Sequence, residues 1–133
     1  MIALDTNVIV RLIVKDDAAQ AKRVRQVLEL AEEQDEQALV SDIVLCELEW
    51  VLKSAYRVPR ARILAALTEL AADARLRFED AHRVRAALDL YQRGDADLSD
   101  YLLGLANESA GARTTYTFDR ALRGDERFTV IGS

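Results

Sequence analysis

Short apolar runs alternate along the chain with longer stretches in which apolar residues recur at the spacing of a helix. The expected strands cover residues 2–4, 38–40, 76–78, 114–118 and 128–131. The expected helices cover about 6–14, 17–33, 41–56, 59–70, 80–94 and 98–109. This alternation predicts an α/β fold of βαβ units, with three α/β/α layers and a central, mostly parallel sheet of about four to five strands.

Residues that favour helix termini mark several of these boundaries. Asp16 or Asp17 is expected to cap the second helix, and Ser41 or Asp42 to start the third. Pro59 suits the first turn of the fourth helix, because its fixed φ matches the helix and its missing N–H is not needed there. The aromatic side chains expected in the core are Trp50, Phe78 and Phe118.

Length and composition indicate one soluble globular domain over residues 1–133. Half of the residues are hydrophobic and 31% are charged, yet no apolar run approaches the ~20 residues that span a bilayer. The start shows no signal-peptide pattern, and the single cysteine, Cys46, excludes an internal disulfide. The chain is therefore expected in the cytoplasm, with no membrane partner.

Two aspartates follow expected strands at distant points of the sequence. Asp5 ends the first strand, in MIALDTNVIV, and Asp119 ends the fourth, in TTYTFD. Ligands of an open parallel sheet bind beyond the carboxyl ends of its strands, so both acids are expected at one edge. Either acid alone is equally well explained as a helix N-cap.

The stretch SDIVLCELEWVL carries two glutamates on opposite sides of one expected helix. Glu47 shares a face with the apolar residues Ile43 and Trp50, whereas Glu49 faces nearly the other way. Glu47 is therefore expected to lie nearer the sheet. The alternative is an amphipathic Glu47 that reaches solvent from a helix edge.

The stretch GDADLSDYLLGLAN places two aspartates at the start of the last long helix. Asp97 is a good N-cap, and Asp100 falls in the first turn, where the helix dipole keeps a carboxylate ionised. The two could also form a capping box with Asp100 in place of the usual Glu or Gln.

Asp5, Glu47, Asp100 and Asp119 can meet at one edge of one sheet. Four clustered carboxylates repel one another unless a cation neutralises them, and Mg²⁺ or Mn²⁺ prefers such oxygen ligands. A metal bound there would activate water and stabilise charge on phosphate oxygens. The set therefore predicts metal-dependent phosphodiester hydrolysis.

These four acids, in ALDTNVIV, SDIVLCELEWVL, DADLSDYLLGLAN and TYTFD, resemble those of PIN-domain ribonucleases. More narrowly, the chain is similar to VapC-type toxins of prokaryotic toxin–antitoxin pairs. The resemblance covers nearly the whole chain, with all four acids in order. It implies a metal-dependent endoribonuclease that leaves a 5′-phosphate and a 3′-hydroxyl, forms a homodimer, and is silenced by a cognate antitoxin protein that covers the active site.

The resemblance also assigns roles to residues. Asp5 and Asp100 would be the principal Mg²⁺ (or Mn²⁺) ligands, and Glu47 would hold or orient a metal-bound water. Asp119 would coordinate directly or through water, or support a second metal. The supporting residues would be Thr6, Asn7 and Thr117 through hydrogen bonds to the acids, and Asp97 as a cap, an outer ligand or both.

The formal net charge of −5 argues against an RNA substrate, because proteins that bind phosphate are usually basic. Cations in the metal site would largely cancel four of the negative charges. Local basic residues would then guide RNA or pair with an antitoxin; the candidates are Arg11, Lys15, Arg57, Arg60, Arg62, Arg120 and Arg123.

Several other classes fit parts of the sequence. A phosphatase-type hydrolase with Asp5 as nucleophile wants a second aspartate two residues on, where Asn7 stands. A receiver-like signalling domain wants an acidic pair after the first strand and a late lysine, and neither is present. A non-catalytic RNA-binding module, with the acids as caps, remains open. His82 is the only histidine, so a ribonuclease with paired histidines is excluded.

Overall fold

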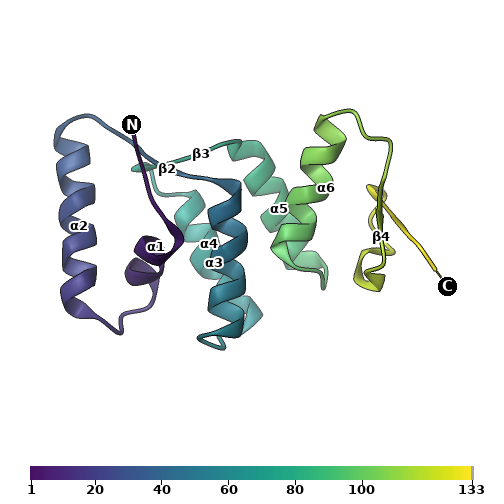
Figure 1. The fold of residues 1–133 in the computed structure, drawn as a ribbon, viewed down its shortest axis with the longest axis horizontal. Helices are drawn as coiled ribbons and strands as arrows, with labels where there is room; N and C mark the ends of the chain where they lie inside the picture. The colour runs from purple at the N-terminus through teal and green to yellow at the C-terminus, as the bar shows by residue number, and fades with distance from the viewer. Residues whose placement is uncertain (133) are drawn as a thin grey trace. The chain divides into compact units, whose positions relative to one another are not determined.

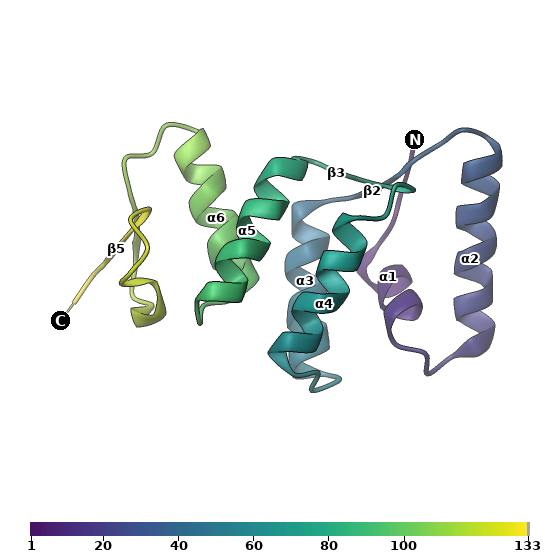
Figure 2. The same ribbon diagram turned by 180° about the vertical axis from the view of Figure 1, so that it is seen from behind.

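The computed structural model describes residues 1–132 and divides into two compact units, Met1–Ala81 and the chain from His82 onward. The first unit contains β1 (Ile2–Ala3), α1 (Thr6–Ile13), α2 (Ala18–Glu33), β2 (Ala38–Val40), α3 (Asp42–Ser54), α4 (Arg60–Ala71) and β3 (Leu76–Phe78). Its strands form one parallel sheet in the order β1-β2-β3, so each connection is a crossover that carries helices (Figure 1). Within this unit α1 contacts both α2 and α3, and α3 lies beside α4 (Figures 1 and 2).

The second unit contains most of α5 (Ala81–Arg93), then α6 (Leu98–Ser109), β4 (Thr115–Thr117), the short 3₁₀ helix η1 (Arg120–Leu122) and β5 (Phe128–Val130). Strands β4 and β5 are parallel and form a two-stranded sheet. Gly104 of α6 allows a close approach here, because a Cβ atom at this position would lie 2.5 Å from the Phe128 ring of β5. A bulkier residue at 104 would therefore push α6 away from the sheet.

The predicted class, an α/β fold with parallel strands, is confirmed, and every expected strand and helix is present. The five strands form a three-stranded and a two-stranded sheet, so the expected four to five strands in one sheet is approximate. Asp17 caps α2 and Ser41 caps α3, each accepting a hydrogen bond from a backbone N–H of the first turn. Pro59 is the N-cap of α4, one position earlier than predicted.

The core of the first unit is aliphatic and follows the buried faces of the helices and of β2. Phe78 is buried, as predicted. Trp50 and Phe118 are not core residues, because 62% and 78% of their surfaces are exposed. Over residues 1–132 no helix is long and apolar enough to cross a bilayer.

Candidate active site

Asp5 lies two residues beyond β1, where the chain turns into α1. Its extended backbone makes it the N-cap of α1, and its Oδ1 accepts a hydrogen bond from the backbone N–H of Thr6 at 2.7 Å. The preceding Leu4 is buried and anchors the strand end, while the carboxylate of Asp5 is exposed. Asp5 thus follows the first strand, as the sequence predicted. It caps α1 through Oδ1 and is exposed to solvent as well.

Thr6 connects this strand end to the middle of α3. The Thr6 side chain is buried, and its Oγ1 donates a hydrogen bond to Oε1 of Glu47 at 3.2 Å, across 41 residues of sequence. Thr6 thus orients Asp5 through its backbone and Glu47 through its hydroxyl. Two of the four predicted acids therefore lie on one exposed surface of the first unit.

The expectation that Glu47 is the glutamate nearer the sheet is wrong. Glu49 is 2% exposed and lies on the buried face of α3, whereas Glu47 is exposed. The prediction failed because it took Ile43 and Trp50 as markers of the inner face, and both are exposed. The inner face is set instead by Val44, Leu45, Leu48 and Leu52.

Asp97 and Asp100 occupy the N-terminus of α6 in the second unit. They form a capping box, in which Oδ2 of Asp100 accepts a hydrogen bond from the Asp97 backbone N–H at 3.3 Å. The chain before them is fixed by Tyr101, whose buried hydroxyl accepts from the Ala96 N–H at 3.2 Å. Gly94 makes room for that hydroxyl, because a Cβ at 94 would lie 2.0 Å from it.

Asp119 follows β4 by two residues and caps η1, with its Oδ1 accepting from the Ala121 N–H at 2.9 Å. Thr117 accepts a hydrogen bond through Oγ1 from the backbone N–H of Asp119 at 3.1 Å. This threonine therefore supports the backbone of Asp119 rather than its carboxylate. The strand end presents an exposed acid, but β4 belongs to the two-stranded sheet and β1 to the three-stranded one, so Asp5 and Asp119 do not follow strands of one sheet as expected.

The acids have the oxygen chemistry that a hard divalent cation requires. In each of Asp5, Glu47 and Asp119, one carboxylate oxygen takes a hydrogen bond and the other has no partner among residues 1–132. A carboxylate held through one oxygen is oriented, and its second oxygen can bind a metal. Among residues 1–132 no group of three or more His, Cys, Asp or Glu side chains is placed to hold a metal ion.

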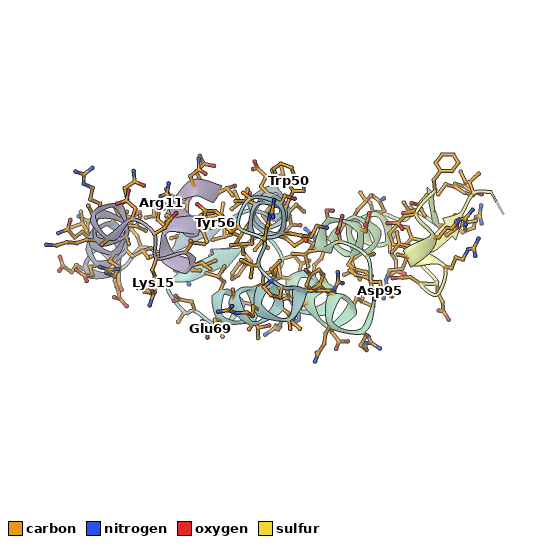
Figure 3. The ribbon with its side chains drawn as sticks, turned by 90° about the horizontal axis from the view of Figure 1, so that it is seen from below. Arg11, Lys15, Trp50, Tyr56, Glu69 and Asp95 are labelled. Carbon is orange, nitrogen blue, oxygen red and sulfur yellow. The ribbon has the colours of Figure 1, made fainter. Side chains whose placement is uncertain are left out.

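Beside this surface a groove of about 470 Å³ runs between α1 and α2. We call it the α1–α2 groove; it is lined by Asn7, Val8, Arg11, Gln20, Arg23 and Val24. Arg11, labelled in Figure 3, lies on α1. Its guanidinium donates to Gln20 and to Asp16, the latter at 3.1 Å. A hydrogen bond with Tyr56, together with the negative charge of Asp16, raises the pKa of Arg11, so this guanidinium stays charged.

Asn7 lines this groove and makes no hydrogen bond to an acid of the site within residues 1–132. His82 is exposed, and its Nδ1 lies 3.3 Å from a guanidinium nitrogen of Arg85.

Comparison with protein families gives the class of this fold. The PIN domain family matches residues 2–124, a range that runs through both units and includes all four predicted acids. The chain therefore belongs to the PIN-domain family. A search of curated proteins found no match.

PIN domains are typically metal-dependent nucleases, so the chain has a nuclease fold. This agrees with the resemblance seen in the sequence at the level of the PIN domain.

Proposed function

We propose that this protein is a metal-dependent endoribonuclease whose catalytic residues are Asp5, Glu47, Asp100 and Asp119. Asp5 and Asp100 hold a Mg²⁺ or Mn²⁺ ion. Asp119 binds it directly, through water, or as part of a second metal site. The family membership and the exposed carboxylates of Asp5, Glu47 and Asp119 support this assignment.

A bound divalent cation lowers the pKa of a coordinated water and offsets the charge that grows on the phosphate oxygens. In this chain Glu47 orients the attacking water and accepts its proton, which its exposed position permits. Thr6 holds Glu47 through the 3.2 Å hydrogen bond to Oε1, which leaves Oε2 to accept that proton. The products are a 5′-phosphate and a 3′-hydroxyl.

The observation that carries the proposal is the link Asp5–Thr6–Glu47. A helix cap explains Asp5 alone, but no cap explains why a buried threonine hydroxyl holds an exposed glutamate of another helix. Such a buried donor with a single long-range partner is typical of an arrangement that positions a reactive carboxylate.

The α1–α2 groove answers the objection from net charge. It is lined by Arg11, six residues after Asp5, and by Arg23, which has no acidic partner among residues 1–132. These guanidinium groups can bind the phosphates of RNA, and the affinity should then fall steeply with added salt.

At the level of biology, we propose that the protein is the toxin of a type II toxin–antitoxin system. It acts in the cytoplasm as a homodimer and is inhibited by a cognate antitoxin that covers the active site. A small gene for a DNA-binding antitoxin next to this one would support the assignment.

Cleavage of structured RNA by the purified protein, with Mg²⁺ or Mn²⁺, tests the proposal. Asp5→Asn should reduce the rate at least about 100-fold without unfolding the protein, because Asn is an equally good N-cap. The matched control is Asp35→Asn, since Asp35 is exposed and has a positive φ that Asn tolerates. An unchanged rate in Asp5→Asn would refute the assignment.

A further inference from the structure

The second unit contains a pocket that the proposed reaction does not use. The pocket has a volume of about 460 Å³ and is formed by the end of α5, the start of α6, η1 and the turn before β5. Its wall includes Leu90, Arg93, Tyr101, Asp125, Glu126 and Arg127. A pocket of this volume can hold a molecule as large as a mononucleotide. Its lining within residues 1–132 includes none of the four proposed catalytic acids.

Asp125 contributes a buried carboxylate to this wall, and one of its oxygens is unsatisfied. The Asp125 side chain is 9% exposed. Its Oδ1 accepts hydrogen bonds from the backbone N–H of Arg127 at 2.9 Å and from the Arg127 guanidinium at 3.3 Å. Its Oδ2 is buried and has no hydrogen-bond partner among residues 1–132. Because an ionised carboxylate only accepts hydrogen bonds, Asp125 calls for an N–H or O–H donor that the described part of the chain does not supply.

The two arginines of the wall differ in how firmly they are held. Arg127 is fixed between Asp125 and Glu108, whose Oε1 lies 3.4 Å from its Nε. Arg93, at the end of α5, is 66% exposed and is paired only with Asp89, one turn earlier, at 2.7 Å. An exposed pair at this spacing holds weakly, so Arg93 can turn to meet an anion. The pocket therefore offers a buried acceptor and an exposed cation to one ligand.

These two features select a ligand with N–H donors at one end and a negative charge at the other. Guanine presents a ring N–H beside an amino group, so it gives a carboxylate two donors. Adenine and cytosine place an unprotonated ring nitrogen beside their amino group, and that nitrogen repels a carboxylate. Leu90 and the buried ring of Tyr101 give the wall an apolar part, which suits a planar base better than a metal ion or a free ammonium group.

We propose that this pocket binds a guanine mononucleotide, with the base donating to Oδ2 of Asp125 and the phosphate bound by Arg93. The site goes beyond the proposed ribonuclease function and does not depend on it. Ala121 lines the same pocket and donates its backbone N–H to Asp119, so the bound nucleotide lies against the turn that holds a proposed catalytic acid.

Isothermal titration calorimetry of the full-length protein with GMP tests the proposal. EDTA is present throughout, so that no divalent cation contributes to binding. GMP should bind saturably at up to about millimolar concentration. IMP lacks the amino group and should bind about ten-fold more weakly, and AMP more weakly still. Guanosine, which has no phosphate, should also bind more weakly than GMP. The Asp5→Asn protein should bind GMP as the parent does.

Asp125→Asn should reverse the preference for the base. The variant keeps Oδ1 for the Arg127 N–H and places an amide N–H where Oδ2 stood. GMP binding should fall at least about ten-fold, and XMP, which has a carbonyl in place of the amino group, should become the preferred ligand. A loss of stability alone does not reverse a preference between two ligands.

Arg93→Ala gives a second, separate test, because Arg93 is exposed and its loss should leave the fold intact. GMP binding should fall about ten-fold, whereas guanosine binding should not change. The matched control is Arg113→Ala, since Arg113 is an exposed arginine of the same unit outside the pocket lining. This control should bind GMP as the parent does.

The proposal is overturned if the parent does not bind GMP, or binds AMP and IMP as well as GMP. Unchanged GMP affinity in Asp125→Asn overturns the contact with the base, and equal GMP and guanosine affinities overturn the phosphate contact. Binding of guanosine only within a single-stranded oligonucleotide, and not as GMP, also overturns a mononucleotide site. None of these results bears on RNA cleavage by the parent, which tests the ribonuclease proposal separately.

Discussion

The two units of the chain present their acids in different ways. In the first unit, Asp5 and Glu47 come from distant segments and are connected through Thr6. In the second, Asp100 makes a hydrogen bond within the capping box of α6, and Asp119 makes one as the N-cap of η1, each with a partner a few residues away. The second pair thus makes local capping contacts, whereas the first pair is joined by a tertiary contact. We propose that all four carboxylates nevertheless act in the same RNA-cleavage reaction.

The largest expected effect on RNA cleavage comes from a substitution of Asp100, which is also part of the α6 capping box. Asp100→Asn keeps an oxygen that can accept from the Asp97 N–H, so the capping box and the melting temperature should change little. Loss of the carboxylate charge should reduce RNA cleavage at least about 100-fold. Asp97→Asn is the control, with an expected loss of less than about ten-fold. If Asp100→Asn cleaves at the parent rate, the second pair consists of caps alone.

A comparison of the two glutamates of α3 separates chemistry from packing. Glu47→Gln should reduce cleavage about 100-fold with little change in stability, because Glu47 is exposed and Gln still accepts from Thr6. Glu49→Gln should leave cleavage nearly unchanged and lower the free energy of unfolding by about 1 kcal/mol, because Glu49 is buried near Lys53. Thermal melts and cleavage rates of both variants measure this, and the reverse pattern would contradict the assignment of Glu47.

Thr6→Val removes the hydroxyl that connects the first pair while it keeps the side-chain shape. The backbone hydrogen bond from Thr6 to Asp5 is unaffected. Cleavage should fall about ten-fold, because Glu47 loses its orientation but not its charge. Thr6→Ser retains the hydroxyl and should recover most of the rate. Equal rates for the Val and Ser variants would show that the link does not matter.

The smallest effect concerns a pair outside the site, in the turn before β3. Arg75 donates to Asp73 through its side chain at 2.8 Å and 3.1 Å, which lowers the pKa of Asp73 below its ordinary value. A depressed carboxyl pKa stabilises the fold above the unfolded-state pKa and loses this effect as the pH falls through the folded-state pKa. Asp73→Asn should lower the melting temperature by about 1–3 °C at pH 7.

This difference between Asp73→Asn and the parent should start to shrink as the pH falls below about 4, the ordinary pKa of an unfolded Asp, and should be lost as the pH passes through the lower pKa of Asp73 in the folded protein. Thermal melts from pH 3 to pH 7 measure it. RNA cleavage at pH 7 should be the same for both proteins, since the pair lies away from the proposed catalytic acids. A difference in melting temperature between Asp73→Asn and the parent that grows on acidification would contradict a stabilising Asp73–Arg75 ion pair.

Much of the fold follows from local rules and was therefore predictable. Apolar alternation and helix-terminal residues located every strand and helix, and strand-end position located Asp5 and Asp119. The capping box of Asp97 and Asp100 was readable from three-residue spacing.

Tertiary details were not predictable in this way. The hydrophobicity of Trp50 and Ile43 predicts burial, but both are exposed. For the same reason Glu47 was predicted to lie nearer the sheet, whereas Glu49 is the buried glutamate. The hydrogen bond from Thr6 to Glu47 joins residues 41 apart and leaves no local signal in sequence.

The binding of Mn²⁺, followed by the loss of the free-ion electron paramagnetic resonance signal, tests most directly whether acids from both units hold one metal ion. The parent protein should bind Mn²⁺ when the ion is added at concentrations up to the millimolar range. Its melting temperature should be higher with the ion present. Asp5→Asn and Asp100→Asn should each weaken this binding at least about ten-fold, and Asp35→Asn should not. Undiminished Mn²⁺ binding in either Asp5→Asn or Asp100→Asn would contradict a shared metal site.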